Sequence, residues 1–300
     1  MKQDVSSVAR PLDAAAALLA VVLCLSWGFN QVAVKLALHD IPPLIQAAFR
    51  STFGALMVVA IARMRGVKLM EPDGTLWPGL IAGVLFGLEF LLIYRGLVWT
   101  TASRTSLFLY LAPFVVVIGA RWFLPGDRFD RWQWGGLLLS FAGLVVAFGV
   151  PTPGGNPREL IGDAMIVLAA VAWGATTLLV KASKLVHAPY EKTLLYQLLV
   201  SAPMLAFAAE LFGERVTAQP SAIAVGSLFY QTFWVAGFTF LAWFALVQRY
   251  SASRLSAFTF LTPLFGVAAG YLVLSEPLTP AFAAAVALVI AGLVLVNRPR

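Results

Sequence analysis

The sequence predicts an all-α integral membrane protein with ten transmembrane helices, arranged as two inverted five-helix repeats. Three observations predict this fold class: the composition, the number and length of the apolar segments, and an internal repeat. Hydrophobic residues make up 60% of the chain and charged residues only 12%. In soluble domains charged residues are about a quarter of the total, so this chain is too apolar for a soluble fold.

Ten apolar segments have roughly the 17 to 25 residues that a membrane-spanning helix needs. They lie at 14–37, 44–64, 76–99, 104–123, 132–150, 160–183, 192–212, 222–247, 254–275 and 280–296. The first follows Lys2 and Arg10, as the apolar part of a signal peptide would. It continues past signal-peptide length without an evident cleavage site, so we predict a first transmembrane helix. The gaps between segments are short and leave no room for a soluble domain.

The first and sixth segments carry the same motif: a Trp-Gly pair, two polar residues, and a lysine at a fixed interval from the tryptophan. Its residues are Trp27, Gly28, Asn30, Gln31 and Lys35 in the first copy, and Trp173, Gly174, Thr176, Thr177 and Lys181 in the second. On a helix these aromatic and polar side chains fall within an arc of roughly 140°. We therefore expect two hydrogen-bonding faces that meet and enclose a site.

A second motif recurs in the fourth and ninth segments. Arg104 follows Thr-Ala-Ser and leads to Pro113, and Arg254 follows Ser-Ala-Ser and leads at the same interval to Pro263. In both motifs the two copies are about half the chain apart. Since each unit has an odd number of helices, the second unit must enter the membrane from the opposite side. We predict one five-helix repeat at 1–150, a linker rich in proline and glycine at 151–159, and the inverted repeat at 160–300.

The positions of the basic residues predict that both termini are cytoplasmic. With that orientation most Lys and Arg residues fall at cytoplasmic helix ends and gaps, as the positive-inside rule requires. The exceptions are Lys35, Arg50, Arg95, Arg104, Arg158 and Arg215. We interpret the net charge of +7 as a topology signal and expect no nucleic-acid partner.

The ten helices in two inverted units, the two repeated motifs, and Arg50 after Pro42-Pro43 resemble the EamA family of the drug/metabolite transporter superfamily over essentially the whole chain. Within that family, the aromatic-rich helices look most like the YddG-type exporters of aromatic amino acids. The resemblance implies an exporter of small amphipathic metabolites, amino acids included, in a bacterial inner membrane. Two alternatives stay open: an importer or exchanger of a carboxylate, nucleoside or sugar, and a membrane sensor or scaffold without a hydrated cavity.

Two ionisable residues lie well inside the predicted spans, where each costs about 2.5 kcal/mol or more unless it is paired or hydrated. Glu89, in the third segment, either faces a cavity, where it would bind a substrate ammonium or a proton, or pairs with Arg50 or Arg95. Arg50 either contacts a substrate carboxylate, pairs with Glu89, or extends its side chain to the membrane surface.

Aromatic and polar positions complete the predicted cavity near the membrane midplane. The candidate substrate-binding residues are Trp27, Asn30, Gln31, Glu89, Tyr110, Trp173, Thr176, Thr177, Trp234 and Phe260. Pro113 and Pro263 are candidate hinges or, alternatively, static kinks. We expect the ridge of Gly79, Gly83 and Gly87 to serve helix packing.

The residue inventory predicts neither catalysis nor metal binding. His39, His187 and the single cysteine, Cys24, have no metal-ligand spacing, and no nucleophile motif or phosphate-binding loop is present. We therefore expect no enzyme activity and no cofactor, and transport driven by a gradient. The expected partners are membrane lipids and a small-molecule substrate, with the chain a monomer or a weak oligomer.

Overall fold

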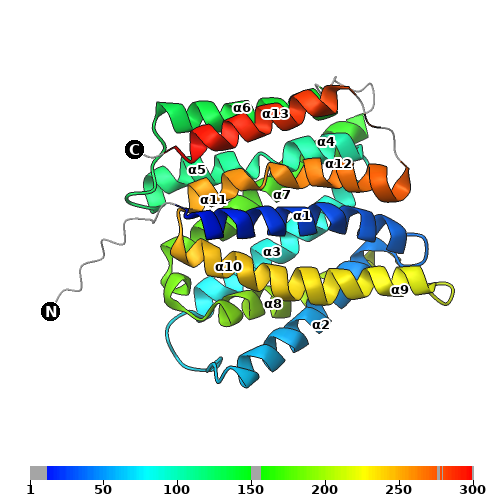
Figure 1. Cartoon of the computed structure of the whole chain (residues 1–300). Helices are drawn as coiled ribbons and strands as arrows, with labels where there is room; N and C mark the ends of the chain where they lie inside the picture. Colours follow the sequence, from blue (N-terminus) through cyan, green and yellow to red (C-terminus); the bar gives the residue numbers. More distant parts are fainter. Residues whose placement is uncertain (1–11, 150–156, 276–277, 279, 299–300) are drawn as a thin grey trace.

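In the computed structural model, which describes residues 12–149, 157–275, 278 and 280–298, the chain folds into a bundle of helices (Figure 1). The α-helices of the first half are α1 (Ala14–Ala37), α2 (Pro43–Met64), α3 (Leu76–Gly96), α4 (Ala102–Leu109), α5 (Ala112–Phe123) and α6 (Arg131–Phe148). Those of the second half are α7 (Pro157–Ala182), α8 (Tyr190–Leu211), α9 (Ala222–Phe229), α10 (Phe240–Arg249), α11 (Ala252–Phe258), α12 (Leu261–Leu274) and α13 (Ala281–Val296). A 3₁₀ turn, η1 (Lys184–His187), precedes α8, and a π-helix, η2 (Tyr230–Thr239), joins α9 to α10.

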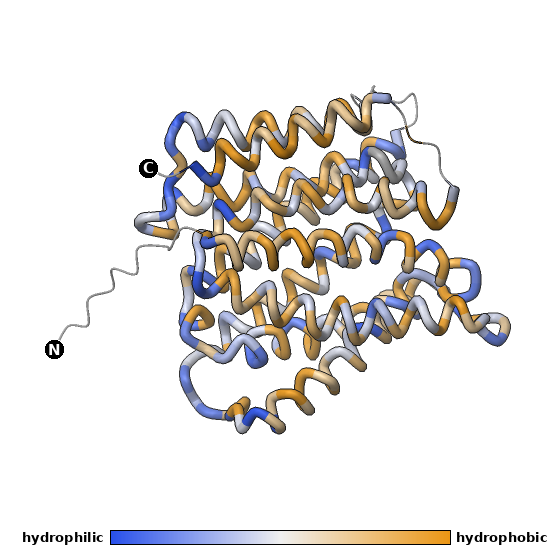
Figure 2. Tube along the Cα trace, in the orientation of Figure 1, coloured by the Kyte–Doolittle hydropathy of each residue, from blue (hydrophilic) through white to orange (hydrophobic). Residues whose placement is uncertain are grey.

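Each of the predicted apolar segments coincides with one helix or with consecutive helices. By length and composition, eight stretches within the described residues can cross a membrane, and α13 is a shorter apolar helix. Helix α6 begins with Arg131 and Gln133, which lower its hydropathy. Hydrophilic residues gather at the two ends of the bundle, and hydrophobic ones along the helices (Figure 2). The fold is that of a multi-pass membrane protein. Most of the predicted linker, like Lys2 and Arg10, lies outside the described residues.

The two ends of the bundle differ. The start of α1 and the end of α13 lie at the same end, on the left of Figure 1, which we call the terminal end. Helix α1 crosses to the other side of the bundle, which we call the distal end. An even number of crossings is needed to bring the chain back to the side on which it started.

The fourth and ninth predicted spans are each interrupted beside their proline. Helix α4 ends at Leu109, shortly before Pro113, and α11 ends at Phe258, shortly before Pro263. A proline has no N–H to donate to the carbonyl four residues earlier, so the α-helical ladder is interrupted at both sites. A hydrogen bond between residues three apart, instead of four, replaces it at the first site: the N–H of Leu111 donates to the Phe108 carbonyl at 3.1 Å. Movement at these two breaks remains a prediction.

The repeated arginine motif proves to be a helix cap in both copies. The side-chain oxygen of Thr101 accepts a hydrogen bond from the N–H of Arg104 at 3.2 Å. The Ser251 hydroxyl accepts one from the N–H of Arg254 at 3.1 Å. A hydroxyl at this position satisfies a backbone donor that the first helical turn leaves free. The motif therefore recurs because α4 and α11 begin in the same way.

The repeated Trp-Gly motif permits close helix packing. A Cβ atom on Gly28 of α1 would lie 2.7 Å from the backbone nitrogen of Gly266 in α12. A Cβ atom on Gly174 of α7 would lie 2.7 Å from the Cβ of Val115 in α5. Each glycine thus allows its helix to lie against a proline-broken helix of the other half. The predicted packing role of Gly79, Gly83 and Gly87 is confirmed, because all three lie against α8.

Corresponding helices of the two halves pack in opposite directions. Near the start of α2, the N–H of Leu44 donates to Glu214, just after the end of α8, at 2.9 Å. Further along α2, Ser51 accepts a hydrogen bond from Ser201 at 2.9 Å. Residue numbers rise along α2 as they fall along α8, so the two helices are antiparallel. Helices α6 and α13 are antiparallel as well, with bonds from Gln133 to Val296 and from Ser140 to Val289.

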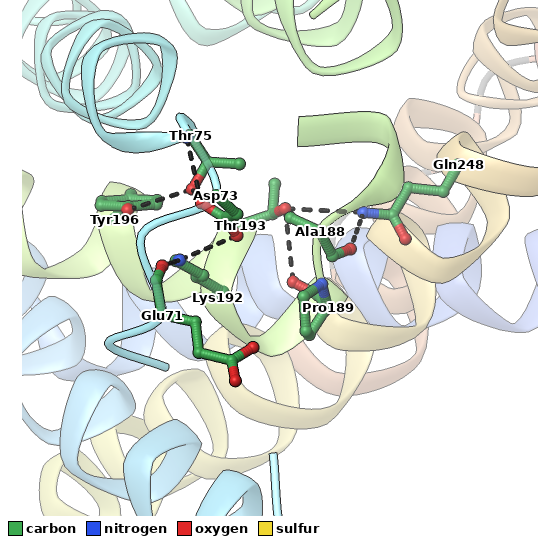
Figure 3. Close-up of polar contacts among 9 residues, drawn as sticks. All are labelled: Glu71, Asp73, Thr75, Ala188, Pro189, Lys192, Thr193, Tyr196 and Gln248. Carbon is green, nitrogen blue, oxygen red and sulfur yellow. Dashed lines mark hydrogen bonds and ion pairs between the residues drawn. The ribbon is translucent and has the colours of Figure 1, made fainter. Parts of the chain in front are cut away.

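A polar network ties the helices together at the terminal end (Figure 3). Lys192 on α8, whose side chain is only 4% exposed, pairs with Asp73 at 2.9 Å in the loop between α2 and α3. Thr75 donates to Asp73 and also contacts the Tyr196 hydroxyl at 3.2 Å. Hydrogen bonds from Thr75 and Lys192 lower the pKa of Asp73 well below its usual value of 3.8, so this carboxylate is ionised at neutral pH. We call Asp73, Thr75, Lys192 and Tyr196 the terminal network.

Candidate functional site

A cavity of about 530 Å³ lies inside the bundle, between the two halves. Its walls come from α1, α2, α3 and α4 of the first half and from α7, α8, η2, α10 and α12 of the second. The predicted residues that line it are Trp27, Asn30, Gln31, Glu89, Tyr110, Trp173, Thr176 and Thr177. Both copies of the Trp-Gly motif therefore contribute to one cavity.

Trp234 and Phe260 do not line the cavity. Trp234 is 45% exposed, and its indole N–H donates to the Ser26 hydroxyl at 3.1 Å. It lies in the π-helix η2, where more residues per turn displace positions that an α-helical wheel would assign. Phe260 lies in the break between α11 and α12, and its fully buried ring packs beside Phe114 and Phe141.

Aromatic rings surround both tryptophans of the cavity. The Trp27 ring lies edge-on to Trp243 at 5.1 Å and to Phe240 at 6.0 Å between centroids. Its indole N–H donates to Thr239, the last residue of η2, at 2.9 Å. The Trp173 ring lies edge-on to Tyr110 at 5.8 Å. These rings form apolar walls, held in place by edge-to-face contacts, against which a flat or apolar group can stack.

Several buried polar atoms of the cavity wall have no hydrogen-bond partner within the described residues. Buried oxygen atoms of Asn30, Thr105 and Gln197 make no hydrogen bond, and each of these residues lines the cavity. Buried polar groups in proteins are nearly always bonded to protein or water. The cavity therefore has the chemistry of a space that holds water or a polar ligand.

Arg50 and Glu89 are buried in the cavity wall, with 2% and 8% of their surfaces exposed. The guanidinium of Arg50 lies over the Phe90 ring, 4.1 Å from its centroid, and its Nε and Nη2 atoms have no hydrogen-bond partner. Within the described part of the chain, no ion pair joins Arg50 to Glu89. Arg95 does not pair with Glu89 either, since it lies over the ring of Phe212 at 3.8 Å. Of the alternatives for Glu89, an ion pair with Arg50 or Arg95 is thus not found among the described residues.

The cavity extends toward the distal end of the bundle. Its lining includes Lys35 and Leu38 where α1 ends, and Leu97 and Thr100 after α3. At the other extreme it stops about two helical turns, roughly 10 Å, inside the start of α8, where Gln197 lies. The terminal network lies beyond that floor, so the two ends of the bundle are not equivalent.

The mouth of the cavity is held by ion pairs. Arg104 on α4 binds Asp163 on α7 through its Nε at 3.0 Å, and it also pairs with Glu159 at 3.5 Å. The Thr100 hydroxyl donates to the same Asp163 at 2.6 Å. The arginine of the first repeated motif therefore joins the two halves beside the cavity entrance.

The contribution of α8 to the cavity was not predicted, and that of α2 was only one alternative for Arg50. Arg50 and Gln197 are the lining residues on these helices. A usable signal was present, because a strongly polar residue inside an apolar span usually faces a cavity or another helix. By contrast, Thr105 and Ser106 resemble the small residues of any packed helix, and nothing in the sequence distinguishes them.

The profile of the EamA-like transporter family matches residues 14–149 and again residues 160–298. The chain is 26% identical over 260 residues to the Uncharacterized transporter YoaV of Bacillus subtilis, covering 86% of this chain and 88% of that protein. It is 27% identical over 287 residues to a Probable amino-acid metabolite efflux pump of Salmonella typhimurium, covering 92% of each.

One solved crystal structure superposes with a TM-score of 0.80 at 23% identity, over 95% of this chain and 96% of the other. At this identity the likeness concerns the fold alone. The family match spans nearly the whole chain and includes both sets of helices that build the cavity. The protein is a member of the EamA-like transporter family.

Proposed function

We propose that the protein exports small amphipathic metabolites, chiefly amino acids including aromatic ones, by alternating access around the central cavity. One observation carries the proposal: the cavity combines aromatic walls with buried polar atoms that lack a protein partner. A static core would have satisfied those atoms. The name of the Salmonella relative, a probable amino-acid metabolite efflux pump, supports the same substrate class.

The proposed mechanism uses two inverted five-helix units, residues 1–150 and 160–300. Three observations support the inversion: the antiparallel pairing of α2 with α8, that of α6 with α13, and the paired glycines of the Trp-Gly motifs. In such an arrangement the units can exchange conformations, which moves the opening from one end to the other. The proline breaks beside the cavity are the places where bending costs least, since the helical ladder is already interrupted there.

The proposed location is a bacterial inner membrane with both termini in the cytoplasm. The bacterial relatives and the gathering of basic residues at the terminal end support it. In this orientation the terminal network is cytoplasmic, and the cavity extends toward the outside. Transport draws on a gradient of the substrate or of a coupled ion.

The test is flux from liposomes that contain the purified protein and are preloaded with labelled tryptophan, phenylalanine or threonine. Replacing Trp27 or Trp173 by alanine should lower the flux of an aromatic substrate roughly three- to tenfold, because a stacked ring pair contributes about 0.5–1.5 kcal/mol. Trp77→Ala is the matched control, since Trp77 is 74% exposed and lies outside the cavity. Flux that is unchanged in both cavity variants contradicts the site, and no flux of any of the three contradicts export and favours a sensor.

A further inference from the structure

The guanidinium of Arg50 is buried but lacks hydrogen-bond acceptors for two of its nitrogen atoms. A guanidinium has five N–H donors and stays protonated in proteins. The Phe90 ring lies against one face, yet an aromatic face cannot accept the in-plane hydrogen bonds of the guanidinium. Its buried Nε and Nη2 atoms have no acceptor. An unpaired buried charge is costly, so this side chain needs an anion or water that the described residues do not supply.

Glu89 lies at the same depth in the cavity wall. Arg50 is about two turns from the distal start of α2, and Glu89 is about two turns from the distal end of α3, roughly 10 Å in each case. Trp27 lies deeper, roughly 15 Å from the distal end of α1. A small molecule that enters from the distal end therefore passes Lys35, then meets Arg50 and Glu89, and reaches the tryptophan ring last.

The second half of the chain lacks an equivalent pair of charges. By the offsets of the repeated motifs, Tyr196 corresponds to Arg50, and Thr239 corresponds to Glu89. Both have protein partners, because Tyr196 contacts Thr75 and Thr239 binds Trp27. The cavity is thus electrically asymmetric, with its charged groups on one half and on one side.

We propose that Arg50 donates hydrogen bonds to the carboxylate of the substrate and that Glu89 accepts one from its ammonium. The protein then selects molecules that carry both groups, with the side chain directed inward to the rings of Trp27, Trp173 and Trp243. This assignment rests on the proposed transport function and narrows it to zwitterionic amino acids. Molecules of similar size that carry only an ammonium or only a carboxylate are poor ligands, because each leaves one of the two buried charged groups without a partner.

The labelled substrate is whichever of tryptophan, phenylalanine and threonine the wild-type protein transports fastest. The experiment measures how well unlabelled analogues compete with it. For tryptophan, the competitors are tryptamine, which lacks the carboxylate, and indole-3-propionate, which lacks the ammonium. Unlabelled tryptophan should compete roughly 10- to 100-fold better than either, as expected for one lost hydrogen bond to a charged group.

Two variants assign the groups. Arg50→Met should weaken tryptophan binding by a similar factor and leave tryptamine unchanged, so that the two now compete equally. Glu89→Gln should weaken tryptophan binding by a similar factor and leave indole-3-propionate binding unchanged, so that these two compete equally. Arg95→Met is the matched control, because Arg95 also lies over a phenylalanine ring but does not line the cavity. Retained tryptamine binding in Arg50→Met shows that the variant is folded.

Equal competition by all three compounds in the wild-type protein would overturn the assignment and leave the transport function standing. So would an Arg50→Met variant that still prefers tryptophan to tryptamine. The absence of binding or flux for every amino acid tested would instead contradict the proposed function itself. Loss of tryptamine binding together with tryptophan binding, in an Arg50→Met variant whose thermal unfolding midpoint matches that of the wild type, would also contradict a separate carboxylate contact.

Discussion

At Gly28 the backbone of α1 lies so close to α12 that one added carbon would stand 2.8 Å from the Thr262 carbonyl oxygen. Thr262 also lines the cavity, so this contact positions part of the site. The twin residue Gly174 has the same relation to α5, where the nearest backbone atom is the carbonyl oxygen of Ala112 at 3.2 Å. Small residues at such crossings permit the backbone contact on which membrane helices depend.

We predict that Gly28→Ala and Gly174→Ala each destabilise the protein by about 1–3 kcal/mol, the usual cost of forcing an extra carbon into a packed interface. The measurement is the midpoint of thermal unfolding in detergent. Gly226→Ala in α9 is the control, because a Cβ there meets no atom within 4 Å. If the Gly226 variant loses as much stability as the other two, close packing at the motif is not the cause.

Single residues also show what the sequence could and could not predict about the site. Trp27 and Trp173 line the cavity, and the sequence marked them because they recur with their neighbours in both halves, which is difficult to produce by chance. Trp234 and Phe260 do not line the cavity, because the chain departs from α-helical geometry at both positions and hydropathy does not report that departure. For Arg50 the sequence left a substrate contact, an ion pair and an extension to the membrane surface open, and only the atomic arrangement shows that its Nε and Nη2 atoms have no hydrogen-bond partner.

At the scale of elements, the terminal network closes the end of the bundle that the cavity does not reach. Lys192 of α8 joins the loop between α2 and α3 through the Asp73 side chain and the Glu71 carbonyl oxygen, at 2.9 and 2.8 Å (Figure 3). Gln248 of α10 donates to the Ala188 carbonyl at 2.9 Å, which attaches that helix to the start of α8. In the proposed alternating-access mechanism, opening toward this end would break these bonds.

We predict that Lys192→Met weakens this closure by on the order of 1 kcal/mol, because Asp73 is partly exposed and water screens the pair. The rate at which an impermeant maleimide added at the terminal end labels Thr177→Cys, in a Cys24→Ala background, should rise roughly fivefold. Lys68→Met is the control, since Lys68 forms an exposed pair with Glu71 in the same loop. An equal rise in both variants, or none in Lys192→Met, would show that the network does not control access.

The elements themselves were predictable in position but not in detail. Hydropathy located the spans within a few residues, because an apolar run of the right length has few alternatives in a bilayer. The breaks before Pro113 and Pro263 were expected only as bending points, and the π-helix η2 was not foreseen. The helix breaks and the π-helix both depend on which carbonyl accepts each backbone hydrogen bond. The hydropathy of a segment does not indicate that pairing.

For the whole molecule, the two halves are interlocked rather than side by side. Helix α1 packs on α12 of the second half, and α7 packs on α5 of the first. The cavity lies where these helices meet, with walls from both halves. A rearrangement of one half against the other therefore changes the cavity directly, whereas two independent domains could not couple in this way.

Family membership and overall fold were accessible from the sequence because they rest on order and repetition, and the charges in the cavity became interpretable only with the packing.

The most direct test of the account is the orientation of the two halves in the membrane. Met70, in the loop after α2, and Val216, in the loop after α8, are exposed and hold corresponding places in the two halves. Each is replaced by cysteine in a Cys24→Ala background, and cells are treated with an impermeant maleimide before and after they are opened. We predict that Val216→Cys is labelled in intact cells and Met70→Cys only in opened ones. Labelling of both from the same side would contradict the inverted arrangement and, with it, the alternating cavity.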